Sequence, residues 1–280
     1  MRSMRQGITD REEDYQEDKS MNLKQVTSIY FSPTESTRHV VELIAEQIHG
    51  NRESLDLTDA VKTRPDYGFT ENEAVLVGVP VYGGRVPETA VRRLKRLHGH
   101  NTPAVLVVTY GNRAYEDALL ELKDIMTEQG FVPAAAAAVV TEHNIVRTIA
   151  AGRPDDRDRE LISRFGEQVD GLLSTVAGSH YLPGITVKGN RPYRAYHTVP
   201  MKIRVGSSCN GCGTCIRKCP VQAISRTDAK VTDEERCISC MRCVRVCPME
   251  ARRVSSLLLL AVRQKLKKVC SDRKEPEFFL

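Results

Sequence analysis

The sequence lacks features that would mark several common protein classes. No cysteine occurs before Cys209, and all nine cysteines of the 280-residue chain lie from that residue onward. A disulfide framework would not leave most of a chain without cysteine, so the clustered thiols indicate metal ligands in a reducing, cytoplasmic compartment. The apolar runs, such as Leu257 to Val262, are far too short to cross a bilayer. With 41% hydrophobic and 28% charged residues, the composition is typical of a soluble folded protein.

The length of the chain favours two folded domains. Residues 1–22 form a mixed-charge stretch with few apolar side chains, so we expect a disordered lead. The remainder divides into an α/β domain (23–175), a linker (176–203), a cysteine-rich domain (204–253), and a C-terminal amphipathic helix with its tail (254–280).

The cysteine-rich domain contains the pattern C-x2-C-x2-C-x3-C-P twice, with an offset of 28 residues. The x2 spacing lets successive thiolates turn around one face of an iron–sulfur cubane, whereas the longer x3 step directs the fourth thiolate to the other cluster. The pattern therefore predicts two [4Fe-4S] clusters. One is held by Cys209, Cys212, Cys215 and Cys247, and the other by Cys237, Cys240, Cys243 and Cys219.

Zinc is the alternative metal for clustered thiolates, but its sites normally consist of two C-x2-C pairs separated by a longer spacer. The duplicated motif instead resembles the bacterial-type ferredoxin with two [4Fe-4S] clusters, over residues 201–253. This resemblance implies a small α+β fold and electron transfer. Cys270 stands outside the pattern, and we expect a small packed side chain there.

The charge of the cysteine-containing part bears on its partners. Residues 201–280 carry 17 Lys or Arg against 8 Asp or Glu, a formal excess of +9. Each oxidised cluster with four thiolates carries a charge of about −2, so two clusters remove about four units of this excess. The remaining charge favours an acidic protein partner or the stabilisation of reduced clusters. No aromatic side chains are interleaved with the basic ones, so we expect no nucleic-acid partner.

Residues 22–175 alternate apolar, β-branched runs with amphipathic helical patterns. Buried parallel strands are predicted at 26–31, near 54–57, and at 74–80, 104–110 and 134–141. Helices are predicted between and after them, at about 37–50, 88–98, 115–129 and 156–175. Five βα units give a doubly wound α/β fold with a five-stranded parallel sheet, whose ligands bind at the carboxyl ends of the strands.

Three loops follow the carboxyl ends of predicted strands. The first, SPTEST (32–37), brings four hydroxyl groups to the start of a helix, where backbone amides and the helix dipole favour a phosphate. An ordinary serine or threonine N-cap is the alternative. The other two, VYGGRVP (81–87) and TYGNRAYED (109–117), each offer glycine-flanked backbone and a tyrosine.

The order and placement of these loops resemble a flavodoxin over roughly 150 residues. The resemblance implies an FMN whose phosphate is held by the first loop and whose ring is enclosed by the later loops, between Tyr82 and Tyr115. The implied FMN residues are Ser32, Thr34, Ser36, Thr37, Pro80, Tyr82, Gly83, Gly84, Thr109, Tyr110, Gly111, Asn112 and Tyr115. Glu35 stands where flavodoxins usually carry glycine, and its charge is unfavourable beside a phosphate unless the side chain points outward. A flavodoxin-like fold without a cofactor, or with another nucleotide, is the alternative.

His143 lies just past the last predicted strand. It could reach the flavin edge as a proton donor or contact a substrate, which makes it the candidate catalytic residue. A histidine that only caps the loop is the alternative.

Two segments outside the domains are expected to pack on the protein. Exposure of Tyr181, Tyr193 and Tyr196 in the linker would be costly, so we expect them to contact a domain. The basic C-terminal helix is expected to dock back on the protein, and weak contact with a membrane surface is the alternative.

A flavodoxin-like domain followed by a two-cluster ferredoxin is the arrangement of the EFR-type ferredoxin family, which the chain resembles from about Leu23 to Leu280. The resemblance implies an electron-transfer protein that passes electrons between its clusters, FMN and a partner oxidoreductase. The alternatives are an FMN-dependent reductase acting directly on a small molecule, and a redox or oxygen sensor. No glycine-rich dinucleotide-binding unit is recognisable, so a protein donor is expected rather than NAD(P)H.

Overall fold

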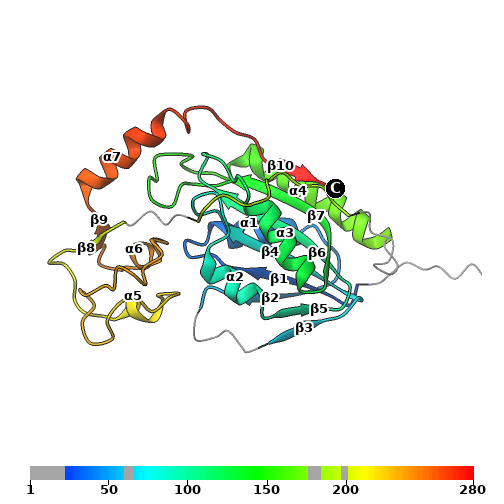
Figure 1. Cartoon of the computed structure of the whole chain (residues 1–280), viewed down its shortest axis with the longest axis horizontal. Coiled ribbons are helices and arrows are strands. Elements are labelled where there is room, and N and C mark those ends of the chain that lie inside the picture. Colours follow the sequence, from blue (N-terminus) through cyan, green and yellow to red (C-terminus); the bar gives the residue numbers. More distant parts are fainter. Residues whose placement is uncertain (1–22, 60–65, 176–183, 197–200) are drawn as a thin grey trace, which may run out of the picture.

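The computed structural model describes residues 23–59, 66–175, 184–196 and 201–280. The predicted lead at 1–22 and Tyr181 of the linker lie outside these residues. A six-stranded sheet with helices on both faces forms one part of the molecule, and the cysteine-rich region (residues 201–254) lies beside it (Figure 1).

The main sheet has the strand order β10-β7-β6-β4-β1-β2, and all of its strands except β10 are parallel. The parallel strands are β1 (Gln25–Tyr30), β2 (Asn51–Asp56), β4 (Glu73–Pro80), β6 (Thr102–Tyr110) and β7 (Phe131–Val140). In chain order these five strands have the arrangement 2-1-3-4-5, which is the flavodoxin-like form of the doubly wound fold. A second, two-stranded sheet pairs β3 (Tyr67–Phe69) with β5 (Leu97–Gly99). The predicted fold class is confirmed.

The predicted number of strands is wrong, because the C-terminal tail adds a sixth. Strand β10 (Glu277–Phe279) pairs antiparallel with Ala136–Ala138 of β7. Phe278 of this strand stacks on Phe165, with ring centroids 4.7 Å apart. A three-residue strand has too little periodicity to be recognised in sequence, and it covers a sheet edge that would otherwise carry unpaired backbone groups. The tail of the predicted segment 254–280 therefore belongs to the α/β domain.

The sheet is buried on both faces. Helices α1 (Ser36–Ala45) and α4 (Asp156–Thr175) cover one face, and α2 (Glu88–Leu94) and α3 (Ala118–Glu128) cover the other. Alternate residues of β4 enter the two cores, because successive side chains of a strand point to opposite faces. Gly78 in β4 allows α1 to pack closely, since a Cβ there would lie 2.3 Å from Cγ2 of Val41. This close packing fixes the loop that begins α1 over the end of the sheet.

The cysteine-rich region is small and mixes strands with short helices, as predicted. Strands β8 (Ile203–Val205) and β9 (Arg252–Val254) pair antiparallel, and helices α5 (Thr214–Arg217) and α6 (Arg242–Arg245) lie between them in the chain.

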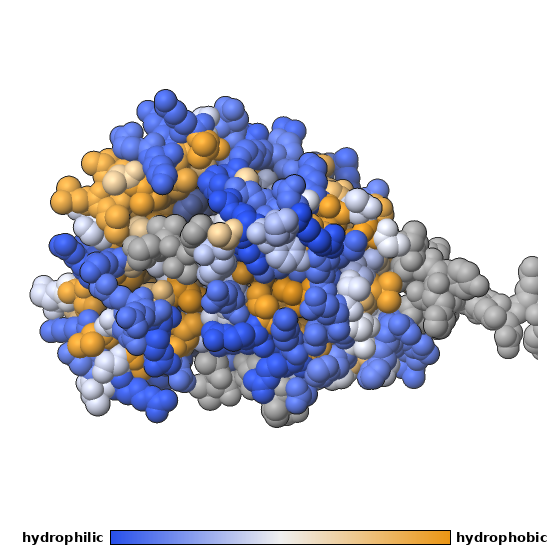
Figure 2. Space-filling model, in the orientation of Figure 1, coloured by the Kyte–Doolittle hydropathy of each residue, from blue (hydrophilic) through white to orange (hydrophobic). Residues whose placement is uncertain are grey.

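Helix α7 (Ser256–Lys267) follows β9 and leads to the tail that returns to the sheet (Figure 1). It contains no buried residue, although Leu258, Leu259, Val262 and Leu266 are half-buried, so the docking of this helix stays a prediction. The tail after it pairs with the sheet. Leu257 and Leu260 are 79% and 52% exposed, and Figure 2 shows the resulting apolar patch over α7. In the described part of the chain, no helix combines the length and the apolar character that a membrane span requires.

Candidate functional site

Two small cavities in the cysteine-rich region are each lined by four cysteines. Cys209, Cys212, Cys215 and Cys247 line the first. Cys219, Cys237, Cys240 and Cys243 line the second. Each cavity thus combines three cysteines of one motif with the last cysteine of the other motif. The structure brings together the two crossed sets that the spacing predicts.

The local backbone turns the thiols inward. Gly213 and Met241 precede α5 and α6 in the left-handed conformation, with φ of 72° and 62°. The fourth thiol of each motif also accepts a backbone hydrogen bond, from Ala223 N to Cys219 Sγ and from Ala251 N to Cys247 Sγ, both 3.3 Å. Among the described residues, no three Cys, His, Asp or Glu side chains converge on one point as the ligands of a single metal ion would.

The two cavities differ in exposure. Cys240 is buried, and burial raises its pKa well above the usual range and raises the pKa of Cys243 to about 11. Cys212 of the other cavity is exposed, and hydrogen bonding with Thr214 lowers the pKa of this thiol. Buried thiols stay protonated when no positive charge lies beside them. Bound iron would supply that charge and stabilise the four cysteines as thiolates.

The predicted phosphate loop (residues 32–37) joins β1 to α1. Ser32 is buried, and its hydroxyl accepts a hydrogen bond from the backbone N–H of Arg38 at 3.0 Å. The hydroxyls of Thr37 and Thr109 lie 2.7 Å apart, which ties the loop to the end of β6. Thr34 and Ser36 line an open cleft, and their hydroxyls lie 3.5 Å apart. At the start of α1, the N–H groups of Arg38 and His39 donate to Ser32 Oγ and Glu35 O, and those of Ser36 and Thr37 can bind an anion.

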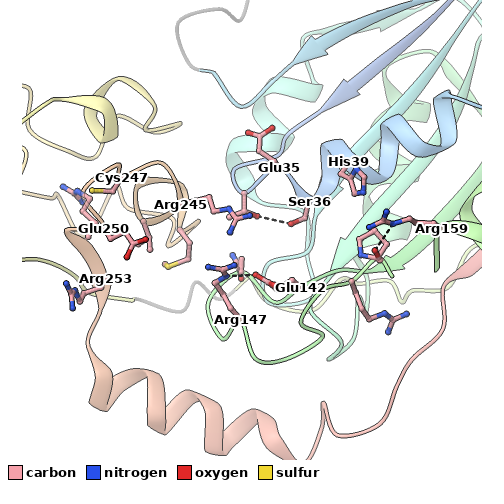
Figure 3. Close-up of a pocket in the computed structure, with 18 residues that line it drawn as sticks. Glu35, Ser36, His39, Glu142, Arg147, Arg159, Arg245, Cys247, Glu250 and Arg253 are labelled. Carbon is pink, nitrogen blue, oxygen red and sulfur yellow. Dashed lines mark hydrogen bonds and ion pairs between the residues drawn. The ribbon is translucent and has the colours of Figure 1, made fainter. Parts of the chain in front are cut away.

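Glu35 adopts a left-handed conformation, with φ of 68°, where the flavodoxin pattern has glycine. Its carboxylate points away from Ser36 (Figure 3). One oxygen lies 3.1 Å from Nη1 of Arg242 and the other 3.6 Å from Nη1 of Arg38. The charge of Glu35 is therefore compensated by two arginines, although Glu35 lines the same cleft as Thr34 and Ser36.

Arg242 connects the cysteine-rich region to this loop. It lies between Cys240 and Cys243 in sequence and is 5% exposed. Besides its contact with Glu35, Nη1 donates hydrogen bonds to the carbonyl oxygens of Ser32 and Pro33, at 3.2 and 3.1 Å. Sequence analysis missed this role, because an arginine within a cysteine motif carries no signal that distinguishes a docked side chain from a solvated one.

The cleft beside the phosphate loop has a volume of about 830 Å³ and extends to α6 and to the segment after β7. This volume is within the range of small-molecule sites. Its lining is rich in arginine: Arg147, Arg153, Arg159, Arg245, Arg252 and Arg253. Three carboxylates also line it, and Figure 3 shows one of them, Glu142, paired with Arg147. Cys247 reaches the wall of the cleft, so a ligand bound there would adjoin a cysteine of the first cavity.

The second predicted flavin loop reaches the other cysteine cavity. Pro80 ends β4, and Tyr82 and Arg85 bridge a turn in which Gly83 and Gly84 have φ of 62° and 85°. The Tyr82 ring is partly exposed, but its hydroxyl is enclosed near Asn144, Tyr196 and Cys240. Burial raises the pKa of this hydroxyl, and the neighbouring Cys240 raises it further. Tyr82 therefore lies where the phosphate-loop domain meets the second cysteine cavity.

The third predicted flavin loop is held by the C-terminal tail. Tyr115 is buried, its ring packs against Tyr110 at 5.4 Å, and its hydroxyl donates to Glu277 at 2.9 Å. This differs from the implied role of Tyr115 as a ring-stacking residue on the flavin. Burial raises the pKa of both tyrosines, that of Tyr110 to about 12. Sequence reasoning missed the partner because Glu277 lies 162 residues away.

Asn112 is also bound by the tail rather than free for a ligand. Its side-chain N–H groups donate to the carbonyl oxygens of Cys270 and Asp272, at 3.1 and 2.9 Å. Its own oxygen accepts from the backbone N–H of Lys274 at 3.3 Å. The main chain of Asn112 is in the left-handed region, with φ of 62°.

His143 packs against the backbone of Gly111, where a Cβ would lie 2.5 Å from the imidazole ring. Its Nδ1 accepts hydrogen bonds from the backbone N–H groups of Ile145 and Val146, at 3.2 and 3.1 Å. Burial lowers the pKa of His143 to about 4, so the ring is neutral at physiological pH. These contacts are those of the capping alternative, and the catalytic role of His143 stays a prediction.

With this geometry in place, the chain can be compared with known proteins. Residues 208–254 match the 4Fe-4S dicluster domain. No curated protein matches the chain. The cysteine cavities thus belong to this dicluster domain.

Solved structures that are similar to the chain include several flavodoxins. A flavodoxin from the domain Archaea is 14% identical and covers 53% of this chain and 98% of its own, with a TM-score of 0.35. A flavodoxin from Streptococcus pneumonia is 14% identical and covers 52% and 98%, with a TM-score of 0.38. Rubredoxin oxygen:oxidoreductase from the anaerobe Desulfovibrio gigas is 15% identical and covers 54% and 37%, with a TM-score of 0.38. The fold assignment made above rests on the strand order.

The residues present fit both kinds of cofactor, although not equally. The two sets of four thiols match the donor set of [4Fe-4S] clusters. The phosphate loop offers hydroxyls and helix N–H groups beside a cationic cleft, which fits the phosphate end of FMN. Of the two tyrosines implied for the ring, only Tyr82 adjoins the boundary with the dicluster domain.

The contact of Arg242 with the phosphate loop gives a first prediction. Replacing Arg242 by Ala leaves two loop carbonyls and the Glu35 carboxylate without the donor that Arg242 supplies. Because Arg242 is buried and Glu35 is half exposed, we expect the docked loop to lose about 2–4 kcal/mol of stability. We expect the backbone amides of Ser32 and of residues 34–37 to exchange hydrogen at least about tenfold faster, measured by mass spectrometry. Arg226→Ala, an exposed position in the same domain, is the control. Equal exchange in both variants would contradict the docking role.

Proposed function

We propose that this protein is an electron-transfer flavo-iron-sulfur protein that exchanges electrons with a partner oxidoreductase. The observation that carries the proposal is the position of Arg242. This residue joins the cysteine set of the second cavity directly to the predicted phosphate loop. A redox centre held by these cysteines and a nucleotide held by that loop would share one interface.

The residues that would hold each cofactor follow from the cavities. One [4Fe-4S] cluster is assigned to Cys209, Cys212, Cys215 and Cys247, and the other to Cys237, Cys240, Cys243 and Cys219. The FMN phosphate is assigned to Thr34, Ser36 and the first N–H groups of α1, with Tyr82 at the ring. When bound, FMN exchanges one or two electrons and each cluster exchanges one, which lets a single chain connect one- and two-electron chemistry.

The protein encloses the second cysteine cavity and places a buried positive charge beside both cysteine sets. Cys219 and Cys240 are buried, which excludes water from one side of their cavity. Arg252 is 2% exposed and lines the first cavity, and its charge lowers the pKa of Cys243 in the second against the effect of burial. A buried guanidinium beside both sets would favour added negative charge on either of them. Its Nε has no hydrogen-bond partner among the described residues, which leaves it free for an acceptor atom of a bound group.

Quantification of iron and flavin in anaerobically purified protein tests the proposal. We expect about eight irons and one FMN per chain, and an uptake of about four electrons in a dithionite titration followed by visible absorbance. Two of these electrons belong to the clusters and two to the flavin. Thr34→Ala together with Ser36→Ala should lower the FMN content and leave iron unchanged. Eight irons without any bound flavin would refute the flavin part of the proposal.

A further inference from the structure

The two cysteine sets are not equally accessible to another protein. The second cavity faces the α/β domain, where Arg93 donates to the carbonyl oxygen of Pro220 at 2.5 Å and Ile238 packs on the main core. In the first cavity, Cys212 is exposed and lies two residues before α5. Only Cys247 of the first set lines the cleft between the domains. A redox protein in solution can therefore approach most closely at Cys212.

The surface around Cys212 is basic and partly apolar. Arg217 and Lys218 are exposed, and Arg217 donates to the carbonyl oxygen of Cys212 at 3.2 Å. Neither cation forms an ion pair with a carboxylate of the described residues. Met249 lines the same cavity and is 44% exposed. Arginine and methionine are enriched in protein–protein interfaces, whose rim is polar.

We propose that Cys212, Arg217, Lys218 and Met249, here named the Cys212 surface, bind an acidic electron-transfer protein. This inference rests on the proposed function. Basic residues that form no ion pair with a carboxylate of the described residues attract a negatively charged surface and accelerate association. In the bound complex one electron passes between the partner's redox centre and the dicluster domain, so that one is oxidised as the other is reduced. No bond or proton changes place.

A reduced plant-type [2Fe-2S] ferredoxin serves as a defined acidic probe, since its potential is low enough to reduce many [4Fe-4S] clusters. Its binding to the cluster-loaded protein is measured by calorimetry, and cluster reduction by stopped-flow absorbance, at low and high salt. The test variant is Arg217→Glu with Lys218→Glu. The matched control is Arg263→Glu with Lys267→Glu on α7, which changes the charge equally at exposed positions. Lys218→Glu alone serves as a second test, because Arg217 also contacts the Cys212 loop.

We expect the test variant to bind the probe at least about tenfold more weakly at low salt and to be reduced correspondingly more slowly. The control should change less than about twofold, and high salt should remove the difference. Equal weakening in both variants, or no measurable binding by the unmodified protein, would overturn the proposal. Cluster reduction by the probe without any change in flavin absorbance would instead refute the proposed function and leave the docking surface intact.

Discussion

In protein with Cys219 and Cys237 both replaced by alanine, we expect about four irons per chain and one intact [4Fe-4S] cluster. Both cysteines line the same cavity, although they belong to different motifs. Their loss leaves two thiols in that cavity, too few to hold a cluster, whereas the other cavity keeps its complete set of four. Iron analysis and electron paramagnetic resonance of the reduced protein measure the outcome.

The matched variant replaces Cys219 and Cys209, which belong to one motif but line different cavities. Each cavity then has three thiols, so we expect no intact four-iron cluster. If each cluster were instead held by the four cysteines of one motif, the Cys209/Cys219 variant would keep one complete cluster and the Cys219/Cys237 variant would keep none. A complete cluster in the Cys209/Cys219 variant, and none in the Cys219/Cys237 variant, would therefore disprove the crossed assignment.

Deletion of residues 273–280 should destabilise the α/β domain by about 5 kcal/mol or more, although these residues lie beyond the dicluster domain. The deletion removes β10 from the sheet and the ring of Phe278 from Phe165. Burial of one large apolar side chain is worth about 1.5–3 kcal/mol, and each hydrogen bond about 1 kcal/mol. It also removes Arg273 from Asp155 and Asp158, of which Asp158 is fully buried.

Urea unfolding followed by far-ultraviolet circular dichroism measures this effect, with the dicluster domain monitored separately by visible absorbance. Glu277→Gln is the graded control, because it keeps the strand and removes only the carboxylate charge that faces Tyr115 and Lys188. This substitution should lower the free energy of unfolding by about 1 kcal/mol. An unchanged unfolding midpoint in the truncated chain would show that the tail contributes nothing to the domain.

The truncation also bears on the flavin loops. The tail binds Asn112 through backbone groups of Cys270, Asp272 and Lys274, and it binds Tyr115 through Glu277. The deletion removes the contacts of Lys274 and Glu277 and keeps those of Cys270 and Asp272, so it loosens the segment that the flavodoxin pattern places around the ring. We therefore attribute the burial of Tyr115 to the tail rather than to the loop sequence itself.

Most of the fold was predictable, because its signals are local. Strands β4, β6 and β7 are apolar runs, whereas β2 is polar, and each of the five parallel strands lies within a few residues of its predicted position. The left-handed residue at position 35 was not predictable from propensity, since glutamate seldom adopts φ of 68°. Only the tertiary structure places Arg242 and Arg38 where they compensate the charge of that residue.

The sequence by itself determined the two cysteine sets, the α/β class and the position of the loop 32–37 between the first strand and the first helix. These features depend on spacings of a few residues, so the chain geometry of a single turn or strand decides them. The tertiary structure decided that Arg242 binds the phosphate loop 210 residues away, and that the tail forms a sixth strand and buries Tyr115. Such contacts join distant segments through one or two side chains, and they leave no periodic pattern in the sequence.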